Sequence, residues 1–266
     1  MFLLSAVAQY VGAVIAVNLF DEVPPATVAW LRVVGATLAL SAFSWRHRGR
    51  RWSRSEIASA ALFGTATGLM NLFFYLGIAR VDLGPSVAIE FIGPIVVAAV
   101  RTRTRRNAIA LGLAVIGVLI LSGLEISGEP LGLFFIFLAS TMWAVYIVVG
   151  SKVARLDRGV SGLTLGLAIG SLVLAPIGLP GSGAVWGSPS LLLSCLVVGV
   201  FSNAIGYGID QNVLRRMSVR RFAVMLALLP VTALVMGAIA LDQRPSPLQL
   251  LGVAFILAGV ISQDRG

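Results

Sequence analysis

The chain has 266 residues, of which 58% are hydrophobic and 12% are charged, and its formal net charge is +9. Soluble domains are about 45–50% apolar and about 25% charged, so this chain has too few charges to cover a water-exposed surface. The composition excludes an ordinary soluble domain and predicts that lipid surrounds most of the protein.

Ten apolar runs approach the length of about 20 residues that a bilayer-spanning helix needs. They cover residues 2–20, 24–45, 57–78, 83–100, 107–124, 131–150, 161–180, 189–212, 219–241 and 246–262. The breaks between them are too short for a soluble domain, and the runs lack the alternation of membrane β-strands. We predict an all-α integral membrane protein with ten transmembrane helices, the first of them a retained helix and not a removable signal.

The basic residues lie in short clusters between the runs, which argues against a nucleic-acid partner. With the N-terminus inside, positive charge gathers in the inner loops, as the positive-inside rule requires. The inner loops hold Arg46, Arg48, Arg50, Arg51, Arg54, Arg101, Arg103, Arg105, Arg106, Lys152, Arg155, Arg158, Arg215, Arg216, Arg220 and Arg221. The outer loops hold only Arg80 and Arg244, against Asp21, Glu22, Asp82, Glu125, Glu129 and Asp242. We predict that both termini are cytoplasmic.

The second half of the sequence resembles the first. Leu111–Ile116 in the fifth run matches Leu251–Ile256 in the tenth, and Pro94 in the fourth run has a counterpart in Pro230 of the ninth. Five helices per half is an odd number, so the second copy must cross the membrane upside down. We predict two inverted five-helix repeats, residues 1–124 and 131–266, which is an arrangement typical of secondary transporters.

Small residues and prolines mark special positions within the runs. Gly64 and Gly68 on one helix, and Gly162, Gly166 and Gly170 on another, are typical of close helix packing, within one chain or in a homodimer. Pro94 and Pro230 interrupt helical hydrogen bonding. Each proline predicts a kink or a set of free carbonyls beside a cavity, and both are candidate hinges.

Two opposite charges are expected deep in the membrane. Glu90 lies some eight residues into the fourth run and Arg32 about nine residues into the second, so both lie roughly 12 Å below the outer edge at about 1.5 Å per residue. One hypothesis is a structural ion pair. The other is a site for a zwitterion, in which Arg32 binds a carboxylate and Glu90 binds an ammonium group or exchanges a proton.

Other polar and aromatic residues of the runs are candidates for lining the same cavity. Asp210 is expected to be either a solvated helix end or part of the site. The remaining candidates are Asn71, Tyr75, Trp143, Tyr146 and Tyr207, for which packing or interface anchoring is the alternative.

One cysteine, Cys195, and one histidine, His47, leave little for a disulfide framework, a zinc site or a histidine-centred triad. No cluster of acids or histidines suits a lipid-modifying enzyme, and no phosphate-binding loop suggests nucleotide hydrolysis. We predict that the protein is not an enzyme and has no metal or cofactor.

The stretches Phe74–Gly84 and Ala88–Pro94 resemble the third and fourth helices of threonine/homoserine exporters, in the EamA-type branch of the drug/metabolite transporter superfamily. Met142–Gly150 is similar to the sixth helix of that family. Phe201–Tyr207 departs from the family's pattern, which has more serine and a proline before the tyrosine.

The resemblance implies ten helices in two inverted repeats, a bacterial plasma-membrane location, and export of small amino acids or related metabolites by proton exchange. It makes Glu90 the leading functional residue. The expected partners are a zwitterionic amino acid or analogue, protons and the lipid bilayer. The alternatives are a multidrug or quaternary-cation exporter, which a free Arg32 beside the site would disfavour, and a non-transporting membrane scaffold or sensor.

Overall fold

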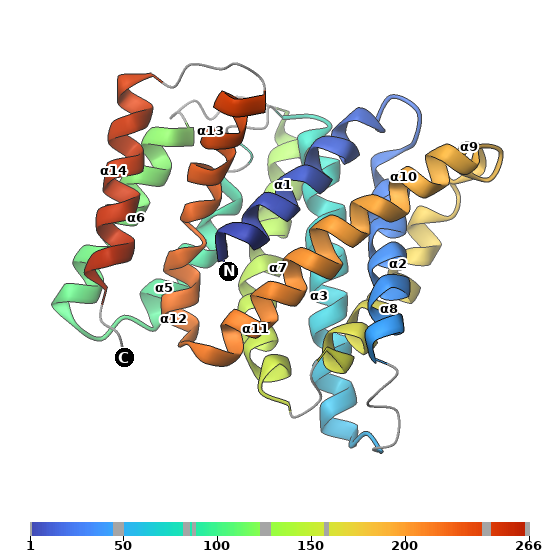
Figure 1. Ribbon diagram of the computed structural model, residues 1–266, viewed down its shortest axis with the longest axis horizontal. Helices are drawn as coiled ribbons and strands as arrows, with labels where there is room; N and C mark the ends of the chain where they lie inside the picture. The colour runs from blue at the N-terminus through green and yellow to red at the C-terminus, as the bar shows by residue number, and fades with distance from the viewer. Residues whose placement is uncertain are drawn as a thin grey trace.

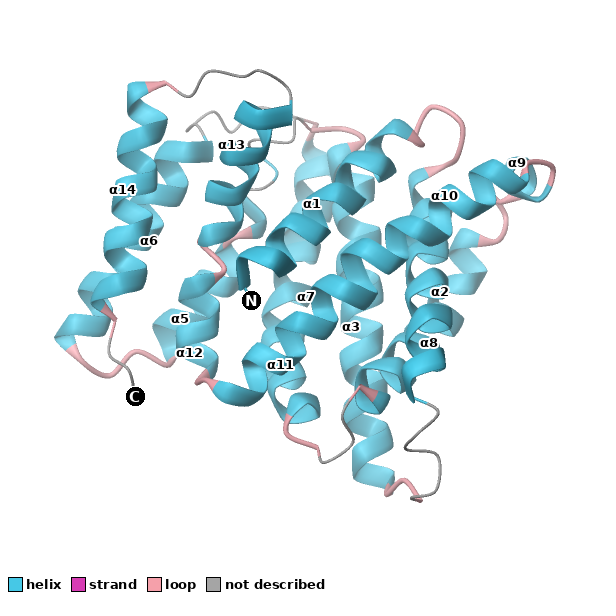
Figure 2. Cartoon of the chain, in the orientation of Figure 1, coloured by secondary structure: helices cyan, strands magenta, loops and turns pink. Residues whose placement is uncertain are grey.

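The computed structural model describes residues 2–44, 51–81, 86, 89–122, 129–156, 160–240 and 246–263. Within these ranges the chain is helical, with turns and short loops and no strand (Figure 2). The helices are α1 (Phe2–Asn18), α2 (Pro25–Ser44), α3 (Arg54–Ile78), α5 (Ile92–Val100), α6 (Arg105–Ser122), α7 (Pro130–Ala154), α8 (Ser161–Gly178), α9 (Gly183–Trp186), α10 (Pro189–Gly199), the π-helix η2 (Val200–Tyr207), α11 (Gly208–Arg216), α12 (Val219–Met225), α13 (Leu228–Ala240) and α14 (Pro247–Ser262).

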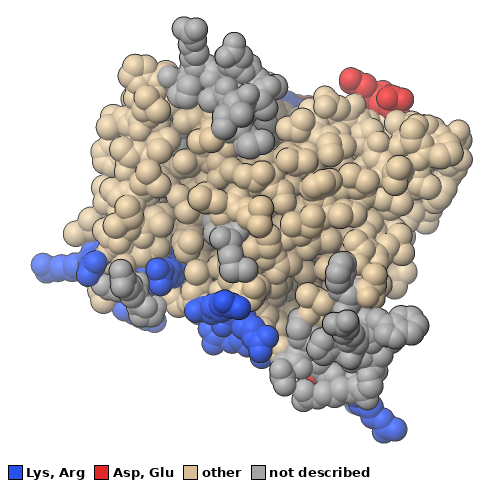
Figure 3. Space-filling model, viewed as in Figure 1, with Lys and Arg blue, Asp and Glu red and all other residues tan. Residues whose placement is uncertain are grey.

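Helix length and surface chemistry agree with a membrane protein. Five described helices are long and apolar enough to cross a membrane: Pro25–Ala42, Arg54–Ile78, Pro130–Ala154, Ser161–Gly178 and Pro189–Arg216. Large apolar side chains point outward, among them Leu172 and Ile261, with exposed fractions of 72% and 78%. On the face drawn in Figure 3, a wide band without described charges lies between a basic lower edge and an acidic patch at the upper edge. Lipid tails fit this band better than water does.

The helices follow the ten apolar runs, with local differences at their ends. α3 begins at Arg54, three residues before the predicted run, because Ser53 and Glu56 form a capping box. α7 continues to Ala154, and the short α9 lies in a segment predicted as a break. In the fourth run, residues 86, 89 and 90 and α5 are described as helical. Residues 82–85, 87, 88, 123, 124 and 241 lie outside the described part.

Neighbours in space come from both halves of the chain (Figure 1). α3 packs against α7 and α8, α2 packs against α8 and α10, and α1 packs against η2 and α13. α6 and α14 form a separate pair, and α5 contacts α7 and α12. The two halves are therefore interleaved, and the centre of the molecule is shared between them.

Glycines bring α3 and α8 into backbone contact. A Cβ atom on Gly64 would overlap the carbonyl of Gly166, and one on Gly170 would overlap the carbonyl of Gly64. The glycines at 64, 68, 162, 166 and 170 all face neighbours within one chain. The prediction of close helix packing is confirmed, and these glycines do not form a face for a second copy.

The predicted helix at 219–241 is divided in two. α12 ends at Met225 and α13 begins at Leu228. Pro230 has no N–H, so the carbonyl of Leu226 lacks the usual helical donor and accepts instead from the Leu229 N–H at 2.8 Å. α5 likewise begins after a turn at Phe91, and Pro94 and Pro230 each occupy the third position of their helix.

The predicted helix at 189–212 extends to Arg216 and changes geometry in its middle. α10 leads without a break into η2 and then α11. A π-helix is rare and is often found at functional sites, since its wider turn redirects the side chains. Sequence periodicity gave no indication of this segment.

We expect Gly64→Ala to lower the free energy of unfolding by about 1–3 kcal/mol, because its methyl group would displace the backbone of α8. Thermal unfolding in detergent micelles measures the effect. Gly112→Ala is the matched control, since a Cβ there meets nothing within 4 Å. Equal melting temperatures for the two variants would contradict this account of the α3–α8 contact.

Candidate functional site

Polar side chains from both halves meet at the centre of the molecule. We call this set the central polar cluster. Hydrogen bonds or electrostatic interactions join its members, which are Ser5, Gln9, Tyr10, Arg32, Asn71, Tyr75, Glu90, Tyr146, Asn203, Tyr207 and Asp210.

Arg32 is the cation of the cluster. It lies on α2 with an exposed fraction of 6%. Its Nε donates to Asn203 Oδ1 at 2.6 Å and its Nη1 donates to the Tyr75 hydroxyl at 2.8 Å. The guanidinium also lies 5.4 Å from the centre of the Tyr75 ring. Both hydrogen-bond partners are neutral, so the positive charge of Arg32 is held in place without being cancelled.

Glu90 is the acid that faces Arg32. Its charge interacts with Arg32, Tyr10 and Tyr207, which come from three different helices. No ion pair within 4 Å joins Glu90 to Arg32, and among the described residues the Glu90 carboxyl has no hydrogen-bond partner. Its side chain is partly exposed. The sequence left a structural ion pair and a binding site open, and this geometry lacks the direct pair.

Asp210 forms a second acidic centre, toward α1. Its exposed fraction is 2%, and its carboxylate accepts from the Ser5 hydroxyl at 2.6 Å and from Gln9 Nε2 at 3.3 Å. The Tyr146 hydroxyl lies 3.5 Å away. The expectation of a solvated helix end is wrong for Asp210, because α1 covers it and α11 continues to Arg216.

Asn71 and the aromatic candidates differ in their roles. Tyr207 donates to Asn71 Oδ1 at 3.3 Å, and its ring lies 5.2 Å from that of Tyr146. Asn71 in turn donates to the Thr67 carbonyl of its own helix. Trp143 packs edge-to-face on Phe91 at 5.0 Å and makes no described hydrogen bond with the cluster. The fold therefore brings together every predicted site residue except Trp143 and the two prolines.

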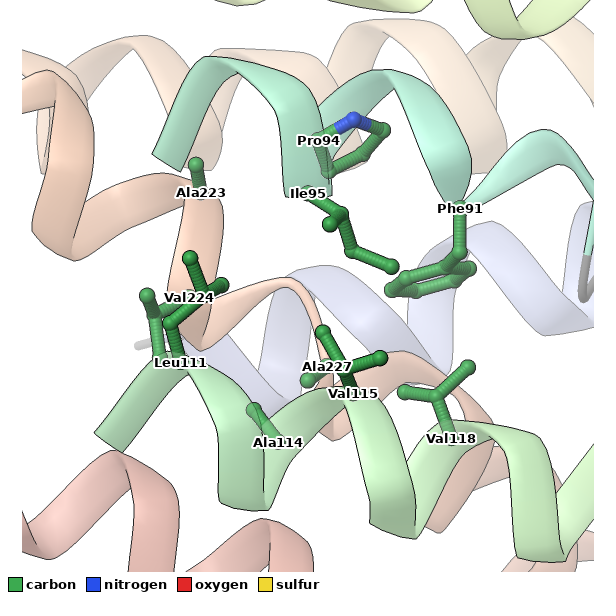
Figure 4. Close-up of a pocket in the computed structure, with 10 residues that line it drawn as sticks. All are labelled: Phe91, Pro94, Ile95, Leu111, Ala114, Val115, Val118, Ala223, Val224 and Ala227. Atoms are coloured by element: carbon green, nitrogen blue, oxygen red, sulfur yellow. The ribbon is translucent and has the colours of Figure 1, made fainter. Parts of the chain in front are cut away.

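Pro94 lies beside an apolar pocket. This pocket lies between α5, α6 and α12 and is lined by Phe91, Pro94, Ile95, Leu111, Ala114, Val115, Val118, Ala223, Val224 and Ala227 (Figure 4). Its lining carries no charged or hydrogen-bonding side chain. Phe91 and Ala227, at the two helix breaks, both line the pocket, so apolar side chains surround both interruptions.

Sequence reasoning missed Asn203, Ser5, Gln9 and Tyr10. Asn203 carried a usable signal, because an amide in the middle of an apolar run must find a partner inside the bundle. Ser5 and Gln9 lie four residues apart, and therefore on one face of α1, and Tyr10 follows directly after Gln9. Ser5 and Gln9 share a target, Asp210, which lies about 200 residues away in sequence, whereas Tyr10 interacts with Glu90.

The comparisons with known proteins agree with this geometry. A model of the EamA-like transporter family matches residues 130–262. The threonine/homoserine exporter RhtA of Escherichia coli (strain K12) is 33% identical over 252 residues, which cover 93% of this chain and 84% of that protein. This chain belongs to the EamA-like transporter family. Its relatives are multi-pass membrane transporters, and those named here are exporters or efflux pumps.

Further relatives have the same character. The threonine/homoserine exporter RhtA of Salmonella typhimurium (strain SL1344) is 33% identical over 256 residues, with the same coverage of 93% and 84%. A probable amino-acid metabolite efflux pump of Escherichia coli (strain K12) is 27% identical over 56% of this chain and 54% of that protein. A solved crystal structure has a TM-score of 0.76 at 17% identity, covering 98% of this chain and 94% of that one, which supports the fold alone.

We expect Ser5→Ala to lower the free energy of unfolding by about 1–3 kcal/mol, because it removes a donor from the buried Asp210 carboxylate. The melting temperature in detergent reports this loss. Ser41→Ala is the control, since among the described residues the Ser41 hydroxyl bonds only the Thr37 carbonyl of its own helix. A Ser5→Ala variant as stable as Ser41→Ala would contradict a stabilising bond to Asp210.

Proposed function

We propose that this protein is a secondary active transporter that exports small amino acids, or related metabolites, in exchange for protons. The observation that carries the proposal is the pair of opposite charges inside the helix bundle, the buried Arg32 and the partly exposed Glu90, which face one centre without a direct ion pair. Charges are rare inside membrane segments and mark substrate or proton pathways. The relatives named above as a threonine/homoserine exporter and a probable amino-acid metabolite efflux pump support amino acids as the substrate class.

The charge arrangement suits a zwitterion. In this proposal the planar guanidinium of Arg32 binds the substrate carboxylate, and Glu90 binds the ammonium group. Tyr75 and Tyr207 supply hydroxyl groups and ring faces between them, and Asn71 and Tyr146 support Tyr207. A substrate with only one of the two charges would leave the other charge of the site uncompensated.

Glu90 is also the proposed proton carrier. Its carboxyl has no described hydrogen-bond partner, so a proton or an ammonium group can occupy it, but not both together. Competition of this kind couples the two fluxes, because substrate release on one side must precede protonation. Asp210 is less suited to this exchange, since Ser5 and Gln9 already donate to its carboxylate.

We infer ten membrane-spanning helices in two inverted repeats, residues 1–124 and 131–266. The pattern of helix contacts supports this topology. When the two repeats are compared in chain order, α1 corresponds to α7, α2 to α8, and α3 to the continuous unit from α10 to α11. The contacts of α3 with α7 and α8 then correspond to those of the second unit with α1 and α2. The contact of α5 with α7 corresponds to that of α13 with α1.

The prolines are the proposed hinges. Pro94 and Pro230 hold the same position in α5 and α13, which are counterparts in the two halves. Both helix breaks lie beside the apolar pocket, where α5 meets α12. Rocking of one half against the other about these breaks would open the central site to alternate sides.

The proposed location is the bacterial inner membrane, with both termini in the cytoplasm. Described basic residues lie at the ends of α3, α6, α7, α11 and α12 that face the basic edge of Figure 3. Several charges that the sequence analysis used lie outside the described residues: Arg46, Arg48, Arg50, Asp82, Glu125, Arg158, Asp242 and Arg244. His47 lies outside them too. A homodimer stays a prediction.

A quaternary-cation exporter is the alternative that the aromatic side chains favour. The rings of Tyr146, Tyr207 and Phe63 lie near Glu90 or one another, as in cation-binding sites. The guanidinium of Arg32 would repel such a substrate. We therefore rank this function second.

We expect Glu90→Gln to abolish proton-coupled transport without unfolding the protein. The measurement is uptake of labelled threonine, homoserine and other amino acids into proteoliposomes under an imposed pH gradient. Glu129→Gln is the control, because Glu129 is a surface acid that lies 3.8 Å from Arg80. Gradient-driven uptake in the Glu90 variant would refute its role, and uptake of cationic drugs alone would favour the second function.

We expect Pro230→Ala to slow transport several-fold while leaving substrate affinity nearly unchanged. An alanine N–H at this position can bond the Leu226 carbonyl and join α12 to α13 in one stiffer helix. Initial rates over a range of substrate concentrations separate the two effects. Pro176→Ala in the unbroken α8 is the control, and an equal loss of rate in both variants would contradict the hinge.

A further inference from the structure

Asn203 is a buried amide in the π-helical segment η2. It is completely buried, in the first half of η2, and Tyr207 follows near the end of the same segment. Both side chains reach the central polar cluster, where Asn203 contacts Arg32 and Tyr207 contacts Asn71. The π-helix thus presents an amide and a phenol to one centre from one helix.

The hydrogen bond to Arg32 fixes which way the Asn203 amide points. Arg32 Nε carries only a donor, so the amide atom 2.6 Å away must be the oxygen Oδ1. The amide nitrogen Nδ2 then lies on the other branch of the same carbon atom. Among the described residues this nitrogen has no hydrogen-bond partner, although it is buried. Buried hydrogen-bond donors nearly always have a partner, so Asn203 Nδ2 is an unsatisfied donor to which an acceptor can bind.

Arg32 has donors left over as well. Its described bonds use Nε and Nη1, while a guanidinium carries five N–H groups in one plane. Tyr75 and Asn203 hold this plane from two sides, one on α3 and the other on η2. The free N–H groups of Arg32 and the free amide of Asn203 are joined through the Nε–Oδ1 bond, so they belong to one donor surface.

We infer that Asn203 determines specificity by binding, together with Arg32, the free carboxylate of the substrate. A carboxylate has two oxygens, and a guanidinium and an amide together offer donors to both. This inference rests on the proposed function and narrows it. The substrates are amino acids whose carboxylate is free, and carboxamides, esters and amines without the acid group are rejected.

A purely structural role for Asn203 has to be distinguished from a binding role. Asn203→Asp keeps the acceptor for Arg32 Nε but removes the N–H groups that would bind substrate. It also places an anion beside Arg32 that competes with the substrate carboxylate. The aspartate variant therefore tests whether the site needs a neutral amide beside Arg32, and a folded variant that keeps the preference for the acid leaves Asn203 a positioning role alone.

The experiment is competition against uptake of labelled amino acid into proteoliposomes, starting with threonine. The competitors are unlabelled threonine and its carboxamide, which differ in charge and hydrogen-bonding capacity at one group. For the wild type we expect the acid to inhibit about 10- to 100-fold more strongly than the amide, as expected for bonds to a charged group. For Asn203→Asp we expect this preference to disappear or reverse.

Ser202→Ala is the matched control. Ser202 is the neighbouring residue of η2, and its hydroxyl donates to the Gln9 carbonyl at 3.4 Å and not to Arg32. We expect this variant to keep the wild-type preference for the acid. An Asn203→Asp variant that keeps the same preference overturns the inference and leaves the transport function intact.

Two further outcomes also decide the inference. Equal inhibition of the wild type by acid and amide overturns it without any variant, which covers the case that Asn203→Asp does not fold. A folded wild type that transports no amino acid overturns this inference together with the proposed function. Uptake of an acid without proton coupling contradicts the antiport proposal alone.

Discussion

The need to stabilise a buried guanidinium shapes the centre of this protein. A cation deep in a membrane helix is costly unless other groups replace its water. Tyr75 of α3 and Asn203 of η2, in different halves of the chain, replace this water by accepting hydrogen bonds from Arg32 of α2. Three helices must therefore converge at one point. Because both partners are neutral, the positive charge of Arg32 remains able to attract an anion. The hydrogen bonds that stabilise the buried guanidinium therefore also hold it ready to bind a substrate carboxylate.

Close backbone packing makes that convergence possible. A Cβ on Gly199, the residue before η2, would overlap the Arg32 carbonyl, and one on Gly35 would overlap the Leu196 carbonyl. α2 and α10 can thus approach only because both carry glycine at the contact. The bond from Arg32 to Asn203 depends on this approach, since Asn203 lies four residues beyond Gly199. Small residues outside the polar cluster thereby set its geometry.

The two ends of the molecule differ in their packing. Around α3 and α8, glycines interlock the backbones and leave little freedom to move. Around α5 and α12, both helices are interrupted and an apolar pocket lies between them. Interrupted segments, which have fewer helical hydrogen bonds, open at lower cost than interlocked ones. In the proposed transport cycle the glycine contacts hold each state together, and the broken helices change between states.

The sequence by itself determined which segments are helical and where charge lies along them. Apolar run length, basic loops and the isolated Glu90 and Arg32 are local properties, so they can be read without a structure. Only the tertiary structure decided the partners of these charges. Arg32 bonds Asn203, 171 residues away, in place of Glu90, and Asp210 is covered by Ser5. The π-helix η2 could not be predicted either, because the periodicity of apolar residues does not reveal an extra residue in a helical turn.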